Sequence, residues 1–135
     1  MGNKRVVHIV DDEETIRKAL SFTLRTAGFA VEAYASGPEF LLSAEDAEKG
    51  CVVLDMHMPD MDGLTATHAI RALSGPAAAT PILAVTADAM PQDAQRCLEA
   101  GIDGIITNRP AVVREAVAAV GVSAEAVERH LRANA

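Results

Sequence analysis

Five short apolar runs recur along the chain, separated by segments in which apolar residues have a different spacing. Short apolar runs rich in valine and isoleucine are typical of strands that are buried in a parallel sheet. We therefore predict strands at residues 6–10, 30–34, 51–54, 81–86 and 104–107. The run at 30–34 is interrupted by Glu32, which favours a position nearer the edge of the sheet.

Between these runs, apolar residues return every three or four positions, the period of an amphipathic helix. The first helix places Ile16, Leu20 and Leu24 on one face and ends at Gly28. A capping box, Ser36 followed three residues later by Glu39, opens the second helix. Four further helices are predicted from the periodic sets Ala66/Ala69/Ile70/Leu73, Ala94/Cys97/Leu98 and Val113/Ala116/Val117/Val120, and from a last short set, Val127 and Leu131 after a Ser123 cap.

Alternating strands and helices predict an α/β fold, a doubly wound five-stranded parallel sheet with helices on both faces. With the strand order 2-1-3-4-5, the first and third strands lie side by side where the order reverses, and functional residues collect beyond their carboxyl ends. The 135 residues fit one domain. We predict that this domain spans residues 1–122 and that residues 123–135 form a short C-terminal helix or tail.

The composition excludes several classes of protein. The formal net charge of −7 disfavours a nucleic-acid partner, because such a surface needs a basic patch. No apolar stretch approaches the roughly 20 residues of a membrane span, and the N-terminus lacks a signal-peptide core, so no membrane partner is expected. Cys51 and Cys97 fit buried, reduced thiols better than a disulfide or a metal pair. These features together predict a cytoplasmic protein.

Carboxylates follow the first and third predicted strands directly. Asp11 and Asp12 come after residues 6–10, and Asp55 comes after residues 51–54. Since the carboxyl ends of neighbouring parallel strands meet at one edge of the sheet, we expect the three side chains to converge. Such a cluster suits a hard cation and leaves one carboxylate as a nucleophile.

Three motifs at the strand ends resemble the receiver domain of bacterial two-component response regulators. They are IVDDE at residues 9–13, LDMHMPDMDG at residues 54–63 and VTA at residues 85–87. The resemblance covers roughly residues 4–120 and implies the flavodoxin-like receiver fold. Residues 84–103 are similar to the receivers attached to hybrid sensor kinases.

The resemblance implies a role for each residue of the site. Asp55 would accept a phosphoryl group from a histidine kinase or a histidine phosphotransfer protein. Mg²⁺ would be held by Asp11, Asp12 and Asp55, with the backbone carbonyl of His57 as a further ligand. Thr86 would donate its hydroxyl group to a phosphoryl oxygen. The resemblance thus implies a phosphoacceptor signalling domain rather than an enzyme, one that would dephosphorylate itself slowly.

The fifth strand departs from the family pattern, which is an aromatic residue followed by a Lys-Pro pair. Without a gap, Ile105 takes the aromatic position and Asn108 takes the lysine position; with one inserted residue, Arg109 and Pro110 match Lys-Pro. Neither alignment restores the lysine, because asparagine is neutral and arginine is a larger planar fork. Asn108 and Arg109 therefore both stay candidates for a phosphate contact.

The leading hypothesis is a stand-alone response regulator receiver, a monomer or weak dimer, that signals to a downstream protein by direct contact. The alternative is a degenerate receiver that binds a protein independently of phosphorylation, which Ile105 and Asn108 favour. A phosphohydrolase of the haloacid dehalogenase type would need a carboxylate where the chain has His57. A dinucleotide-binding site would need a glycine-rich turn after the first strand, where the chain has carboxylates.

Overall fold

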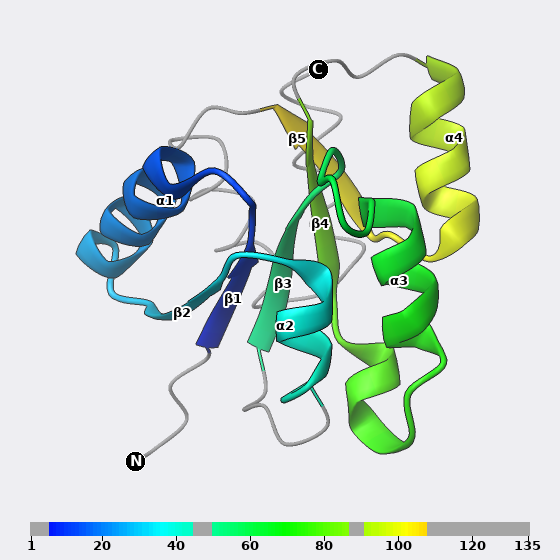
Figure 1. Ribbon diagram of the computed structural model, residues 1–135, viewed down its shortest axis with the longest axis horizontal. Helices are drawn as coiled ribbons and strands as arrows, with labels where there is room; N and C mark the ends of the chain where they lie inside the picture. Colours follow the sequence, from blue (N-terminus) through cyan, green and yellow to red (C-terminus); the bar gives the residue numbers. More distant parts are fainter. Residues whose placement is uncertain (1–5, 45–49, 87–90, 108–135) are drawn as a thin grey trace.

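The computed structural model describes residues 6–44, 50–86 and 91–107. Figure 1 shows the helices and strands. In chain order they are β1 (Val6–Val10), α1 (Glu14–Thr26), β2 (Ala30–Tyr34), α2 (Gly37–Leu41), β3 (Gly50–Asp55), α3 (Gly63–Arg71), the 3₁₀ helix η1 (Gly75–Ala79), β4 (Ile82–Thr86), α4 (Pro91–Ala100) and β5 (Gly104–Thr107).

The strands form one sheet in the order β2-β1-β3-β4-β5, and all four neighbouring pairs are parallel. The predicted α/β fold and strand order are thereby confirmed, with strand ends within one residue of the expectation. The interrupted run with Glu32 is indeed an edge strand. The helices predicted within residues 113–131, and the boundary between residues 122 and 123, lie outside the described residues and stay predictions.

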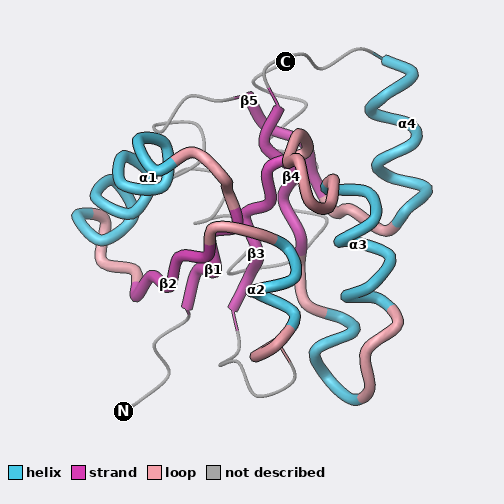
Figure 2. Tube along the Cα trace, viewed as in Figure 1, coloured by secondary structure: helices cyan, strands magenta, loops and turns pink. Residues whose placement is uncertain are grey.

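The described helices cover both faces of the sheet. α1 packs on one face, whereas α2, α3 and α4 lie on the other (Figures 1 and 2). Because side chains alternate along a strand, each inner strand feeds both cores. In β3, for example, Cys51 and Val53 join the cluster under α1, whereas Val52 and Leu54 join the cluster under α2 and α3. The sheet is therefore apolar on both faces, which explains the continuous apolar runs of the sequence.

The two cysteines confirm this division. Cys51 and Cys97 are both buried, as predicted, but they belong to clusters on opposite faces of the sheet. A disulfide between them is thus excluded by the fold. Burial raises the pKa of the Cys51 thiol to about 12, so this thiol stays protonated and behaves as a small apolar side chain.

The ends of the helices follow the expected chemistry with two differences. α1 ends at Thr26, two residues earlier than predicted, and Gly28 follows in the left-handed region with a φ of 100°. Ser36 caps α2 by accepting a hydrogen bond from the backbone N–H of Glu39 at 3.2 Å. The Glu39 carboxylate accepts from the backbone N–H of Ala35 at 3.3 Å instead of from Ser36, so the capping box is displaced by one residue.

Arg71, the last residue of α3, joins several segments at the end of the sheet opposite to the acidic residues. Its guanidinium donates to the backbone carbonyl oxygens of Ala78, Thr80 and Gly101 at 2.6–3.1 Å. It also pairs with the Asp103 carboxylate at 3.0 Å, and Asp103 accepts from the backbone N–H of Ile82 at 2.8 Å. One side chain thus fixes α3, η1 and the ends of α4 and β4 relative to each other.

Arg71→Met should lower the free energy of unfolding by about 2–3 kcal/mol, because it leaves several partly buried acceptors without their donor. The melting temperature should fall by roughly 5–10 °C. Lys18→Met is the matched control, since Lys18 is exposed and pairs with the exposed Glu14 one turn earlier. Equal melting temperatures for the two variants in thermal denaturation would contradict the role of Arg71.

No described helix has both the length and the apolar character needed to cross a membrane.

Candidate functional site

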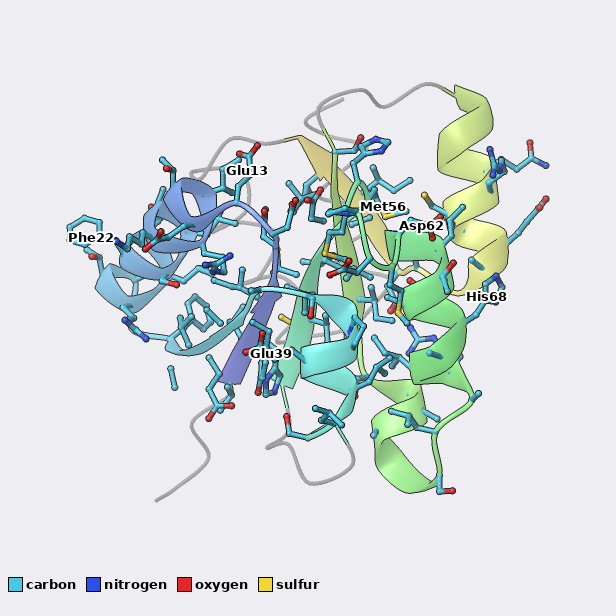
Figure 3. All side chains as sticks on the ribbon, in the orientation of Figure 1. Glu13, Phe22, Glu39, Met56, Asp62 and His68 are labelled. Atoms are coloured by element: carbon cyan, nitrogen blue, oxygen red, sulfur yellow. The ribbon has the colours of Figure 1, made fainter. Side chains whose placement is uncertain are left out.

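The register between β1 and β3 brings the acidic residues together. Val10 pairs with Leu54, so the residues that follow them along the two strands, Asp11 and Asp55, lie at the same end of the sheet. One carboxylate oxygen from each of Asp11, Asp12 and Asp55 lies within 4.8 Å of the others. The convergence expected from the sequence is therefore present. Figure 3 labels the neighbouring residues Glu13 and Met56, which lie at this same end of the sheet.

Two of the carboxylates are held by their own loops. Asp11 Oδ1 accepts from the backbone N–H of Glu13 at 2.9 Å, and Asp55 Oδ1 accepts from the backbone N–H of His57 at 3.1 Å. Each loop is thus an Asx turn, in which the aspartate fixes the backbone two residues further on. Asp11 is only 4% exposed and Asp55 is half-buried, whereas Asp12 is exposed. The site therefore combines two ordered carboxylates with one that faces solvent.

Gly63 lets α3 approach the Asp55 loop closely. Asp62 caps α3 by accepting from the backbone N–H of Thr65 at 2.7 Å, and the Gly63 N–H donates to the carbonyl of Met56 at 3.2 Å. A Cβ atom at position 63 would lie 2.9 Å from Met56 Cα and 3.0 Å from the Asp55 carbonyl oxygen. Any larger residue would push the loop away, so this glycine is a structural part of the site.

The carboxylates open into a cleft of about 220 Å³. Its lining consists of Asp11, Asp12, Glu13, Ile16, Asp55, His57, Val85 and Thr86. Thr86 and His57 were both expected here from the sequence, and both lie in the cleft. Glu13, Ile16 and Val85 also line the cleft, although no role was predicted for them. Glu13 and Val85 belong to the motifs at the strand ends, and Ile16 lies in the first turn of α1.

Other predicted residues lie elsewhere. Asn108 and Arg109 are outside the described residues, so their predicted phosphate contacts stay untested. Ile105, in the family's aromatic position, pairs with Ala84 of β4. It is partly buried against the core under α2 and α3. An aliphatic side chain therefore packs where the family pattern has an aromatic ring.

The site is unfavourable for negative charge. Burial raises the pKa of Asp55 to about 6; the hydrogen bond from His57 opposes this, and the charges of Asp11 and Asp12 add to the rise. Burial also raises the pKa of Asp11 above its ordinary value. Three converging oxygen donors without nitrogen or sulfur fit a hard cation such as Mg²⁺, whose charge would relieve the repulsion.

Comparison with known proteins relates this chain to a family with a similar fold and site. The family model described as response regulator receiver domain matches residues 7–119. The transcriptional regulatory protein FixJ of Rhizobium meliloti is 52% identical over 58 residues, which cover 43% of this chain and 28% of FixJ. The chain spans less than half the length of the curated relatives that it matches.

Solved structures share the fold. The chemotaxis protein CheY4 of Vibrio cholerae matches with a TM-score of 0.76 and 32% identity, over 82% of this chain and 93% of that chain. The receiver domain of the sensor histidine kinase PA1611 from Pseudomonas aeruginosa PAO1 matches with a TM-score of 0.74 and 28% identity. That match covers 84% of this chain and 93% of the other, and the PA1611 structure holds a magnesium ion in its active-site cleft.

The raised pKa of Asp55 predicts a pH-dependent stability without divalent cations. Folded Asp55 keeps its proton up to about pH 6, whereas in the unfolded chain it loses it near its ordinary value of 3.8. The folded state therefore binds more protons in this window, and stability falls as pH rises through it. Asp55→Asn should remove this loss and stabilise the metal-free protein at pH 7 by about 1–2 kcal/mol, a figure reduced for partial solvent exposure.

Thermal denaturation in EDTA and in millimolar Mg²⁺ across this pH range tests the prediction. Mg²⁺ should raise the melting temperature of the wild type and have less effect on Asp55→Asn. Asp60→Asn, in the same loop but exposed, is the control and should behave as the wild type does. Identical wild-type curves with and without Mg²⁺ would count against the site.

Proposed function

The chain belongs to the response regulator receiver domain family, and we propose that it works as a phosphorylation-controlled switch in which Asp55 is the phosphoacceptor. Receiver domains are signalling domains that take phosphoryl groups from histidine kinases. The observation that carries the proposal is the half-buried Asp55 carboxylate, at the end of β3 and within 4.8 Å of two further carboxylates. A surface that only bound a protein would not need three carboxylates this close together, because their negative charges repel one another.

The local contacts support a division of labour in phosphoryl transfer. Asp55 Oδ1 accepts the His57 N–H, so we infer that Oδ2 attacks the phosphorus atom of a phosphohistidine. The P–N bond breaks, the imidazole leaves and an acyl phosphate forms on Asp55. Thr86, in the same cleft, would donate its hydroxyl group to a phosphoryl oxygen. Transfer of this kind depends on positioning and on charge neutralisation rather than on covalent help from the protein.

The residues present fit a divalent cation. We propose that Asp11, Asp12, Asp55 and the backbone carbonyl of His57 hold Mg²⁺, in line with the magnesium ion in the PA1611 receiver. When bound, the cation would neutralise charge on the phosphoryl oxygens. Asp11 and Asp55 contribute oxygens whose orientation is already fixed by their Asx turns.

We further propose the setting in which the switch works. The phosphodonor is a histidine kinase or a histidine phosphotransfer protein, the output is contact with a downstream protein, and the compartment is the cytoplasm. FixJ is a transcriptional regulator by name, so the absence of a nucleic-acid partner rests only on the net charge of −7 of this chain. Slow autodephosphorylation would end the signal.

A degenerate receiver is the second candidate, and Ile105 is the observation that favours it. The family pattern has an aromatic side chain there, and the shorter Ile105 packs partly into the core. A domain without the aromatic side chain could bind its partner in one fixed conformation. The intact acidic cluster counts against this candidate.

Acetyl phosphate with Mg²⁺ should add one phosphoryl group to the wild type, detected by intact mass, and Asp55→Asn should abolish the addition. Asp60→Asn should be modified as the wild type is, because it leaves the cluster untouched. A mass shift that persists in Asp55→Asn would show that another residue is the nucleophile. A wild type that never shifts, even in the presence of a competent phosphodonor protein, would favour the degenerate receiver.

The lysine position gives a separate prediction. A cation beside the phosphoryl group stabilises the charge of the transition state, and Asn108 supplies none. If the ungapped alignment is correct, Asn108→Lys should speed phosphorylation by acetyl phosphate by about tenfold or more, and Arg109→Ala should have little effect. The opposite pattern in the measured rates would assign the role to Arg109.

A further inference from the structure

The loop between β1 and α1 carries two of the three carboxylates, and its backbone is held at three points. The Asp11 N–H donates to the Tyr34 carbonyl at 3.1 Å, and Asp11 Oδ1 accepts from the Glu13 N–H at 2.9 Å. The third contact comes from the helix that follows, through the side chain of Arg17. Glu13, the N-cap residue of α1, makes no side-chain capping bond, so the helix start does not hold the loop in the usual way.

Arg17 ties α1 to this loop by a different contact. Its Nη1 donates to the Asp11 backbone carbonyl at 2.8 Å. Side chains of an α-helix lean towards its N-terminus, which lets Arg17 reach back over the first turn of α1 to the end of β1. Because Asp11 is 4% exposed, its carbonyl depends on a protein donor rather than on bulk water.

Arg17 contacts the β1–α1 loop from the side opposite to the acidic cleft. It is not among the residues that line the acidic cleft. It lines a separate groove of about 610 Å³ between α1 and β2, together with residues such as Phe22 and Ala33. Figure 3 shows Phe22 pointing away from the sheet, and it is 73% exposed. A cation or phosphoryl group in the cleft would therefore meet Asp11 and Asp12, with Arg17 on the far side of their loop.

We propose that Arg17 is a positioning residue for the metal site: its guanidinium holds the β1–α1 loop in the conformation in which Asp11 and Asp12 face Asp55, and so sets the affinity for Mg²⁺. This inference rests on the proposed function, since it concerns the same site. It adds a residue that the three sequence motifs do not contain.

The direction in which removal of Arg17 changes the Mg²⁺ Kd distinguishes a positioning role from an effect of its charge alone. The guanidinium of Arg17 lies 2.8 Å from the Asp11 carbonyl oxygen, so its positive charge is also close to the metal site. If the guanidinium of Arg17 acted only by repelling Mg²⁺, it would weaken Mg²⁺ binding. Removing its charge should then strengthen Mg²⁺ binding. Deleting a tether should weaken binding, because the loop must then be ordered when the ion binds. The two explanations predict opposite changes in Kd.

The chain offers a matched control in Arg25. It lies two turns further along α1 and also donates to a backbone carbonyl, that of Val31 at 3.3 Å. This contact fixes the far end of α1 against β2 and is remote from the acidic cluster. Arg25→Met removes the same charge and the same kind of hydrogen bond as Arg17→Met, but leaves the β1–α1 loop intact.

The experiment is calorimetric titration of the full chain with MgCl₂ at temperatures where each variant is folded by circular dichroism. Arg17→Met should raise the Mg²⁺ Kd by about tenfold, the usual scale for residues that orient metal ligands. Arg25→Met should leave it unchanged. Arg17→Lys should fall between wild type and Arg17→Met, because a single ammonium can replace only part of the fork. The loss should persist at raised ionic strength, where charge effects are screened.

An Mg²⁺ Kd that is unchanged or lower in Arg17→Met would overturn the inference while the proposed function stands. Should Arg17→Met fail to fold, Arg17→Lys decides, and a wild-type Kd in that variant overturns the inference equally. A wild type that binds no Mg²⁺ and accepts no phosphoryl group would instead remove the proposed function itself. These outcomes are distinguishable in one set of titrations and mass measurements.

Discussion

The parallel pairing of β1 with β3 is the constraint on which the site depends. Val10 and Leu54 face each other in register, and the residues that follow them are both aspartates. A slip of one residue would turn every side chain of β3 to the opposite face of the sheet. Since Cys51 and Val53 fill one core and Val52 and Leu54 fill the other, the two cores fix the register. The distance between the carboxylates is thus set by buried apolar residues that do not line the acidic cleft.

The same topology also tempers the cost of clustering negative charge. In a parallel α/β sheet each helix begins where a strand ends, so α1 and α3 both start beside the acidic residues. The N-terminus of a helix carries a partial positive charge and orphan N–H groups. These favour an anion at this end of the sheet, although burial still raises the pKa values of Asp55 and Asp11. A bound cation would therefore lower the free energy of the ionised carboxylates further.

Much of the fold and the centre of the site could be predicted from the sequence. Apolar runs mark strands that are buried on both faces of the sheet. A carboxylate directly after such a run must lie at the carboxyl end of that strand. Contacts made by long polar side chains could not be predicted. Arg71 reaches Asp103, 32 residues away, and no periodic pattern encodes that partner. Arg17 was missed for a similar reason, because it acts through the backbone of another segment. Gly63 is part of the second motif, but its close packing against the Asp55 loop was not predicted.

The bonds of Arg71 also bear on how the chain can vary. Surface connections between helices and strands commonly tolerate insertions and deletions. The connection from α3 to β4 is an exception, because Arg71 binds the carbonyls of both Ala78 and Thr80 within it. An added or deleted residue would shift one carbonyl out of reach of a guanidinium that is also committed to Gly101 and Asp103. The length of this short segment should therefore be as tightly restricted as the composition of the core.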